Sequence, residues 1–182
     1  MEVEIKAKIK DFSDIKNKLL KLGAKLGKNK KQIDIFYKPK NEVKSTLRPG
    51  LYILRIRESG NNKLLTFKAL TPIKGVWEEY EVKIDNIKEM QKILEKLGLV
   101  KVFTIHKIRI PGKLGDFEFN LDKVEELGNY IEIGLIAKDG GKAQNKIREL
   151  YSKLGIRDNQ LERRGYGEII SAQIGIKSNG VK

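Results

Sequence analysis

The sequence contains no cysteine, and this absence excludes several classes of protein at once. Without thiols the chain cannot form disulfides, hold a metal ion through thiolates or use a cysteine nucleophile. A single histidine, His106, also excludes a metal site built from several histidines of one chain. Any bound metal must therefore be a hard cation held by carboxylates, and we expect Mg²⁺ or Mn²⁺.

Long apolar runs are missing as well. No stretch reaches the length of a membrane span, and the N-terminus lacks the basic and then apolar layout of a signal peptide. We therefore expect a cytoplasmic protein with no membrane partner. Hydrophobic residues still make up 40% of the 182 residues, which is enough to build a substantial core.

Acidic residues are in the minority. The chain has 38 lysines and arginines against 24 aspartates and glutamates, which gives a formal net charge of +14. This excess predicts an anionic partner, which could be a nucleic acid, an acidic membrane surface or a small polyphosphate. Nucleic acid is the less favoured partner, because most aromatic residues fall on apolar faces or in helices rather than among exposed basic residues.

Three segments end alike, and each predicts an amphipathic helix. They are "NKLLKLG" ending at Gly23, "KILEKLG" ending at Gly98 and "ELYSKLG" ending at Gly155. Their apolar residues follow helical spacing, and the final glycine is typical of a left-handed helix stop. Alternating runs predict strands over residues 2–10, 31–38, 51–58, 63–70, 76–84, 101–110, 114–122 and 129–136.

The order of these elements repeats: a strand, a helix and three strands occur twice, and a third helix follows. We expect an α+β fold of two similar halves, in which eight antiparallel strands form a closed or nearly closed β-barrel, a tunnel with helices packed outside. Turn signals lie at residues 48–50, 59–62 and 111–115. A single domain over residues 1–170 and a flexible tail over residues 171–182 complete this prediction.

Charged residues occupy one face of most predicted strands. If the helices cover the apolar faces, the charged faces point into the barrel, where unpaired ions would be prohibitively costly. A triphosphate with divalent ions would neutralise both signs of charge. The residues of this hypothesis are Arg55, Arg57, Lys68, Lys107 and Arg109 for the phosphates, and Glu2, Glu4, Asp122 and Glu132 for the metal. The alternative is an open antiparallel sheet with one solvated face.

The N-terminal segment "EVEIK" (residues 2–6) resembles the ExExK signature of the CYTH superfamily, the triphosphate tunnel metalloenzymes. The similarity continues in order through "QIDIFY", "LRIR", "LTFK", "EEYEV", "HKIR", "LDKVEELGNYIEI" and "RRGYGEII". It implies a closed antiparallel barrel that binds a triphosphate with magnesium or manganese.

The resemblance also implies roles for single residues. Lys6 resembles the catalytic lysine of the signature, which contacts phosphate or orients the nucleophile. Glu2 and Glu4 resemble the metal ligands of the first strand, and Asp122 and Glu132 resemble a second group of metal ligands. The implied substrate-binding residues are Arg55, Arg57, Lys68, Lys107, Arg109, the middle acids Glu79 and Glu81, and Arg164 of the closing segment.

Two positions depart from the family pattern. Gly134 stands where a second acid usually follows Glu132, and Trp77 stands where an arginine is often found before the middle acids. The missing carboxylate weakens one metal site, or Glu118 substitutes for it.

Two reactions remain open for such a site. The segment "QIDIFYKP" resembles a pattern of cyclase-type members and favours a class IV adenylate cyclase, which converts ATP into cyclic AMP and pyrophosphate. The first alternative is a triphosphatase that acts on thiamine triphosphate, tripolyphosphate or a nucleoside triphosphate. The second is a non-catalytic module that binds polyphosphate or RNA. The oligomeric state stays open, with a homodimer among the alternatives.

Overall fold

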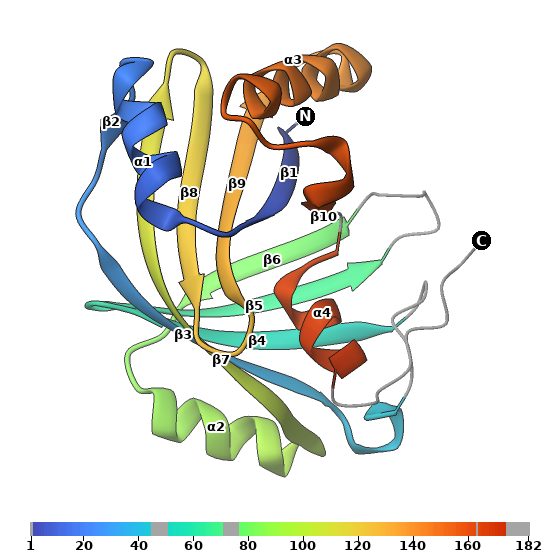
Figure 1. The fold of residues 1–182 in the computed structure, drawn as a ribbon. Coiled ribbons are helices and arrows are strands. Elements are labelled where there is room, and N and C mark those ends of the chain that lie inside the picture. Colours follow the sequence, from blue (N-terminus) through green and yellow to red (C-terminus); the bar gives the residue numbers. More distant parts are fainter. Residues whose placement is uncertain (1, 45–50, 71–76, 163, 174–182) are drawn as a thin grey trace. The chain divides into compact units, whose positions relative to one another are not determined.

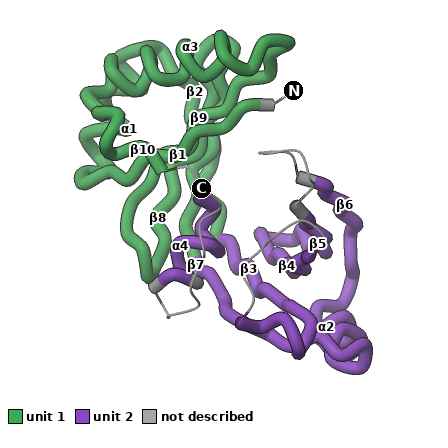
Figure 2. Tube along the Cα trace, turned by 90° about the vertical axis from the view of Figure 1, so that its right-hand side faces the viewer, with its two compact units in different colours: residues 1–31, 107–163 green, residues 32–106, 164–182 purple. Residues whose placement is uncertain are grey.

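The computed structural model describes residues 2–44, 51–70, 77–162 and 164–173 of the chain. The chain divides into two compact units, each built from two segments of the sequence (Figure 2). Unit 1 contains residues 1–31 and 107–163, and unit 2 contains residues 32–106 and 164–182. In the described ranges no helix is both long enough and apolar enough to cross a membrane.

Strands and helices follow one another much as the sequence predicts (Figure 1). The three predicted helices and the eight predicted strands are present, whereas β2, β10 and α4 are not among the predicted elements. The elements are β1 (Glu2–Ile9), α1 (Phe12–Lys21), β2 (Lys25–Leu26), β3 (Lys30–Pro39), the short 3₁₀ helix η1 (Lys40–Glu42), β4 (Tyr52–Ser59), β5 (Asn62–Leu70), β6 (Trp77–Lys83), α2 (Ile87–Lys96), β7 (Leu99–Leu114), β8 (Phe117–Val124), β9 (Gly128–Ile136), α3 (Gly140–Lys153), the 3₁₀ helix η2 (Asp158–Gln160), β10 (Leu161–Glu162) and α4 (Tyr166–Gln173).

Helix α1 shows why the predicted helices begin and end where they do. Its N-cap Asp11 accepts hydrogen bonds from two backbone N–H groups of the first turn. Gly23 follows the helix with a φ of 89°, a left-handed conformation that glycine adopts at little cost. Gly98 and Gly155 follow α2 and α3 in the same way, with φ of 83° and 77°. The predicted glycine stops are therefore confirmed.

The strands follow the hydrogen-bonded order β10-β1-β9-β8-β7-β3-β4-β5-β6, and β2 pairs with β7 off this path. Every ladder with a described register is antiparallel, as predicted. Among the described residues no ladder joins β10 to β6, the two ends of this order. The chain therefore has an α+β fold with a mostly antiparallel sheet, and its closure into a barrel is not confirmed.

The core of unit 1 lies between helices α1 and α3 and the apolar faces of β1, β8 and β9. Ala7, Leu121 and Ile133 of these strands are fully buried, and so are Leu19 of α1 and Ile147 of α3. Each large aliphatic side chain buried in this way contributes about 1.5–3 kcal/mol to folding. In this unit the prediction that helices cover the apolar strand faces is confirmed.

Unit 2 has a smaller core, in which α2 packs against β3 and β4. Its buried cluster contains Tyr37, Ile56, Leu94 and Leu99. The hydroxyl of Tyr37 also accepts a hydrogen bond from Nε2 of Gln91 on α2, at 2.9 Å. This contact ties the helix to strand β3.

Helix α4 packs against a pair of aromatic rings in the same unit. The ring centroids of Phe36 and Phe103 lie 4.7 Å apart. Gly167 of α4 comes so near to them that a Cβ at this position would lie 3.2 Å from the Phe103 ring. A glycine inside a helix usually weakens it, so close packing accounts for its presence here.

Strand β7 is longer than predicted, and the hairpin to β8 turns later. The predicted turn at residues 111–115 is wrong in its start, because the ladder continues to Leu114 and the chain turns at Gly115, with a φ of 56°. Gly112 pairs with Phe119, and a Cβ at Gly112 would overlap the Phe119 ring. This glycine therefore serves a close approach of ring and backbone instead of a turn.

The other turn and tail predictions have mixed outcomes. The turn at residues 59–62 is confirmed, because Ser59 pairs with Asn62 across it. The predicted turn at residues 48–50 lies outside the described residues. Of the predicted tail, residues 171–173 complete α4, and residues 174–182 lie outside the described residues.

Candidate functional site

The face of the unit 1 sheet opposite its helix-covered side presents charged residues in cross-strand rows. Lys6 of β1 lies opposite Glu132 of β9, and Glu132 lies opposite Asn120 of β8. Arg109 of β7 lies opposite Asp122 of β8. Side chains that lie directly opposite one another share a face and stand close together. Strand pairing therefore gathers residues that are far apart in the sequence.

These charged side chains form the unit 1 network. Arg109 donates to both oxygens of Asp122, from Nε at 2.7 Å and from Nη2 at 2.6 Å. Nη2 also lies 3.3 Å from Oε2 of Glu132, whose Oε1 lies 2.7 Å from Nζ of Lys6. Nζ of Lys107 lies 3.6 Å from Oδ2 of Asp122. Three cations and two carboxylates thus meet, and within these five residues one positive charge is in excess.

The unit 1 network is largely shielded from water. The side chain of Asp122 is fully buried and that of Glu132 is 13% exposed. Burial raises the pKa of Glu132, but the charge of Lys6, its hydrogen bond and the charge of Arg109 together hold that pKa below its ordinary value. Glu132 is therefore ionised at neutral pH. Buried ion networks seldom stabilise a fold better than apolar packing does, so this one points to a function.

A second set of charged residues, the unit 2 network, lies on strands β3 to β6. Arg57 donates to both oxygens of Asp34, at 2.7 and 2.8 Å. Nζ of Lys68 lies 2.7 Å from Oε2 of Glu79, its partner across the β5–β6 ladder. The members of this network are Asp34, Arg55, Arg57, Thr66, Lys68, Glu79 and Glu81.

Arg55 is the most buried cation of the unit 2 network. Its Nη2 donates to the Thr66 hydroxyl at 3.0 Å and lies 3.4 Å from Glu81. Its Nε is buried and has no hydrogen-bond partner among the residues that the structure describes. Burial and the charge of Arg57 lower the pKa of Arg55. A buried guanidinium with an unused donor is suited to receive an anion.

Most of the predicted site residues belong to one of these two networks. Unit 1 brings together Lys6, Lys107, Arg109, Asp122 and Glu132. Unit 2 brings together Arg55, Arg57, Lys68, Glu79 and Glu81.

Three predicted residues are placed differently. Glu4 is an exposed residue of β1. Glu2 begins β1, but its side chain lies outside the described part of the chain, as does that of Trp77. Arg164 is exposed and precedes α4, and the contacts given above for the unit 2 network do not include it.

Two members of the unit 2 network are absent from the sequence prediction. Asp34 binds Arg57, and the hydroxyl of Thr66 bridges Arg55 and Glu81, with 2.9 Å to the Glu81 carboxylate. The sequence does contain an indication of the role of Asp34, because it is the one acid of β3 and lies between two isoleucines. Such an acid needs a buried partner. Thr66 has no comparable signal, since threonine is common in any strand.

The carboxylates of unit 1 fit a hard divalent cation in part. Glu4 and Glu132 lie on adjacent strands, on the same face and in neighbouring rows. Carboxylate oxygens are the ligands that Mg²⁺ and Mn²⁺ favour. Asp122 fits less directly, because both of its oxygens already accept from Arg109. Glu132 is paired as well, because its Oε1 lies 2.7 Å from Nζ of Lys6 and its Oε2 lies 3.3 Å from Nη2 of Arg109, so an ion bound here would share both buried carboxylates with cations.

Gly134 lies in the middle of a row of acids. It is opposite Glu4 on β1 and opposite Glu118 on β8. Glu118 is exposed, and its carboxylate lies 2.6 Å from Nζ of Lys113. The position of the missing family acid thus adjoins two carboxylates, one of which is paired with a lysine.

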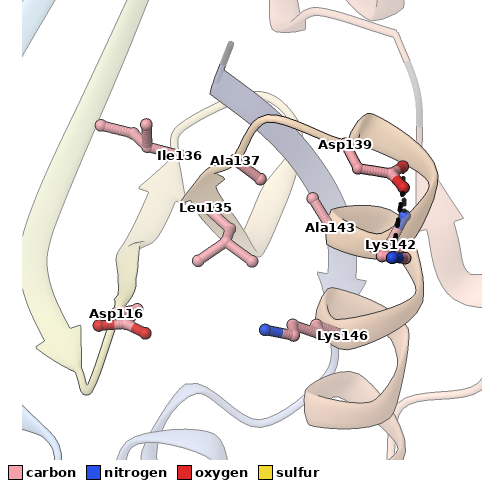
Figure 3. A pocket seen from close by; sticks show the side chains of 8 residues that line it. All are labelled: Asp116, Leu135, Ile136, Ala137, Asp139, Lys142, Ala143 and Lys146. Carbon is pink, nitrogen blue, oxygen red and sulfur yellow. Dashed lines mark hydrogen bonds and ion pairs between the residues drawn. The ribbon is translucent and has the colours of Figure 1, made fainter.

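A separate cavity of about 470 Å³ lies beside the start of α3 in unit 1 (Figure 3). At its rim Asp139, the N-cap of α3, accepts a hydrogen bond from the backbone of Lys142. The cavity contains none of the predicted site residues, so the candidate site is defined by the ionic networks. Its lining residues are Asp116, Leu135, Ile136, Ala137, Asp139, Lys142, Ala143 and Lys146.

Known proteins resemble this chain over nearly its whole length. A protein of Methanocaldococcus jannaschii, named as a presumed adenylate cyclase, is 35% identical over 174 residues, which are 93% of this chain and 98% of that protein. A solved Pyrococcus horikoshii structure matches with a TM-score of 0.77 at 24% identity, over 91% of this chain and 97% of its own. A conserved Pyrococcus furiosus protein matches with a TM-score of 0.76 at 28% identity, over 91% and 98%.

The family comparison covers both units. The family model of the CYTH domain matches residues 1–166, which include every member of the two networks. The resemblance drawn from the N-terminal signature and the later segments is thereby confirmed, and the chain belongs to the CYTH family.

Proposed function

We propose that this protein is an enzyme that binds a triphosphate with Mg²⁺ or Mn²⁺, and that it converts ATP into cyclic AMP and pyrophosphate. The proposal rests first on Arg55, a buried guanidinium whose Nε has no partner among the described residues. Phosphate oxygens are strong acceptors with a geometry that matches the guanidinium fork. An anionic ligand at this nitrogen would therefore satisfy a donor that no described residue engages.

The unit 1 network supports an anionic ligand independently. Its three cations outnumber its two carboxylates, and all five side chains are at most 18% exposed. Burying several ions together is costly, and each of them needs partners. A phosphate group would offer further acceptors to the three cations, whereas a solvated sheet face would not need to bury these ions.

Lys6 is the proposed catalytic residue. Its Nζ lies 2.7 Å from Glu132, so the carboxylate holds the ammonium group in a defined place. A fixed cation stabilises the negative charge that develops on phosphate oxygens during phosphoryl or nucleotidyl transfer. A metal ion held by Glu2, Glu4 and Glu132, with Asp122 as a further ligand, would supply charge neutralisation and polarise the phosphorus.

The clamp for the phosphates is proposed to consist of Arg55, Arg57, Lys68, Lys107 and Arg109, with Glu79, Glu81 and Arg164 as further substrate-binding residues. Within it, Glu79 and Glu81 orient Lys68 and Arg55. A single domain over residues 1–170 and closure of the sheet into a barrel belong to the same proposal. The family match over residues 1–166 supports both.

The cyclase reaction is preferred over hydrolysis because of the 35% identical relative, whose name presents it as a presumed adenylate cyclase. In the cyclase reaction the 3′-hydroxyl of ATP attacks the α-phosphorus and pyrophosphate leaves. In the alternative, a triphosphatase, water attacks the terminal phosphorus, the bond to the bridging oxygen breaks and the diphosphate part of the substrate leaves, so that orthophosphate is formed. The same cations would serve both reactions. The reaction therefore depends on whether the site positions the 3′-hydroxyl of ATP or a water molecule as the nucleophile.

Product analysis tests the proposal directly. Purified protein is incubated with ATP, tripolyphosphate and thiamine triphosphate, each with Mg²⁺ or Mn²⁺, and cyclic AMP, pyrophosphate and orthophosphate are measured separately. Equal amounts of cyclic AMP and pyrophosphate are expected, whereas orthophosphate would indicate the triphosphatase. Absence of all three products would overturn the proposal.

A matched pair of cation variants links the activity to the site. Arg55→Gln should abolish turnover. Lys92→Gln removes another cation that contacts a carboxylate, 3.0 Å from Glu89 on α2, but Lys92 belongs to neither network. The K92Q variant should therefore keep full activity. Equal activity of the two variants would contradict the assignment of Arg55.

Thermal shifts test the non-catalytic alternative. Tripolyphosphate should raise the Tm far more than AMP at equal concentration, because the cations bind contiguous phosphates. A ligand at about 100 times its Kd adds about 2.7 kcal/mol to the stability of the folded state. An RNA-binding module would instead respond to an oligonucleotide, and its response would fall steeply with salt.

A further inference from the structure

Tyr151 of α3 lies behind the Lys6–Glu132 pair, on the helix-covered side of the unit 1 sheet. Its side chain is almost fully buried. Its hydroxyl oxygen lies 2.6 Å from the carbonyl oxygen of Ile5 and 3.2 Å from that of Ile131. These two residues immediately precede Lys6 and Glu132, which pair across the β1–β9 ladder.

The hydroxyl therefore contacts the two peptide groups that lead into the charged pair. Each peptide group is planar, so its orientation sets the direction of the side chain that follows it. One hydroxyl hydrogen shared between two carbonyls on adjacent strands restrains both planes together. The contact thus reaches Lys6 and Glu132 through the backbone, from the face opposite to their side chains.

Core packing alone does not explain a hydroxyl at this position. Tyr151 belongs to the same buried cluster as Ile133, Ile147 and Leu154, all of which are fully buried. A phenylalanine would fill the same space without a polar group to satisfy. Burial and the charges of Glu132 and Glu4 raise the pKa of Tyr151, so the hydroxyl keeps its proton and remains a donor at any working pH.

We propose that Tyr151 is a positioning residue, which fixes the Lys6 ammonium and the Glu132 carboxylate relative to each other for the reaction of the bound triphosphate. This inference rests on the proposed function. Catalytic groups must be held within a fraction of an ångström of the productive geometry, and small displacements reduce the rate without abolishing binding.

The test compares Tyr151→Phe with Tyr37→Phe. Tyr37 is a matched control because it is equally buried and its hydroxyl also has a hydrogen-bond partner, Gln91, but it lies in the core under α2. Both variants should lose a few degrees of Tm. Only Y151F should lower kcat, by about tenfold, with KM nearly unchanged, because ground-state binding by the clamp is preserved. Equal kcat in the two variants, or a change confined to KM, would overturn the proposal.

A second measurement keeps the test decisive. Hydrogen exchange at the amides of Lys6 and Glu132 needs no turnover. We expect faster exchange in Y151F than in Y37F whether or not the wild type acts on a triphosphate. If the exchange differs but the wild type is inactive, the proposed function is wrong and the restraint by Tyr151 still holds. Unchanged exchange would show that the hydroxyl does not restrain these peptide groups.

Discussion

Replacing Gly134 by glutamate would place a new acid between Glu4 and Glu118. Gly134 lies directly opposite both residues, and side chains opposite one another in an antiparallel pair have Cβ atoms about 5 Å apart. Each of the two like-charge pairs costs up to about 1 kcal/mol without a bound cation. Replacing a glycine inside a strand stabilises the fold by about 0.5–1 kcal/mol, which offsets part of this repulsion. We expect the G134E variant in EDTA to lose about 1 kcal/mol, or roughly 3 °C of Tm.

Divalent ions should reverse the sign of this effect. An ion bound by Glu4 and Glu132 would gain the new carboxylate as a ligand, and the repulsion among the acids would disappear. Tenfold tighter binding corresponds to about 1.4 kcal/mol. The metal concentration for half-maximal activity should therefore fall about tenfold in G134E, with Mn²⁺ affected at least as much as Mg²⁺.

The assay is a metal titration followed by both melting and activity. Gly134→Gln is the control, because it has nearly the size of glutamate but no charge. If G134E and G134Q respond to metal alike, position 134 does not adjoin a metal site and Glu132 loses its assignment as a ligand. If Glu118 already supplies the missing ligand, G134E brings no gain and Glu118→Gln impairs activity in the parent.

Three further predictions concern carboxylates of unit 1. Glu4→Gln should abolish turnover and leave the Tm nearly unchanged, because Glu4 is exposed and only its charge is lost; a metal titration of the activity checks this. Asp122→Asn leaves Arg109 and Lys107 short of a buried counter-charge and should cost about 3–5 kcal/mol in urea unfolding, and tripolyphosphate should recover part of the loss. The pKa of Glu132 is lower in the folded chain than its ordinary value of 4.5, so the ionised carboxylate stabilises the fold at pH values above 4.5. This contribution disappears as the pH falls through the folded-state pKa. The free energy of unfolding, measured with urea between pH 6 and pH 3, should therefore fall more steeply in the wild type than in Glu132→Gln.

The alternation of residues in the strands predicted the faces of the sheet but not the partners of the charges. From Phe117 to Asp122 the even positions of β8 hold polar residues and the odd positions hold apolar ones, and the structure buries the odd positions Phe119 and Leu121 under the helices. The sequence could not show that Asp122 binds Arg109 in a bidentate pair, because the contact depends on the register between β7 and β8. Asp122 was predicted as a metal ligand, and that role stays a prediction.

The elements that the sequence did not predict owe their form to tertiary contacts. Strand β10 has two residues, Leu161 and Glu162, which is too short for any alternation to be recognised. Helix α4 contains Gly167, a residue that lowers the expected helix propensity. Its place is explained only by the neighbouring rings of Phe36 and Phe103, which no local pattern reveals.

The pairing of β1 with β9 has a consequence for the time at which the chain can fold. This ladder joins Glu2 to Ile136 and Ile9 to Asn129, so the first strand has no β9 partner until most of the chain exists. At ribosomal rates of about 5–20 residues per second, the delay is on the order of ten seconds. During it the edges of β1 are open to pairing with other chains. The charged Glu4, Lys6 and Lys8 between its apolar residues protect the nascent segment from aggregation in that interval.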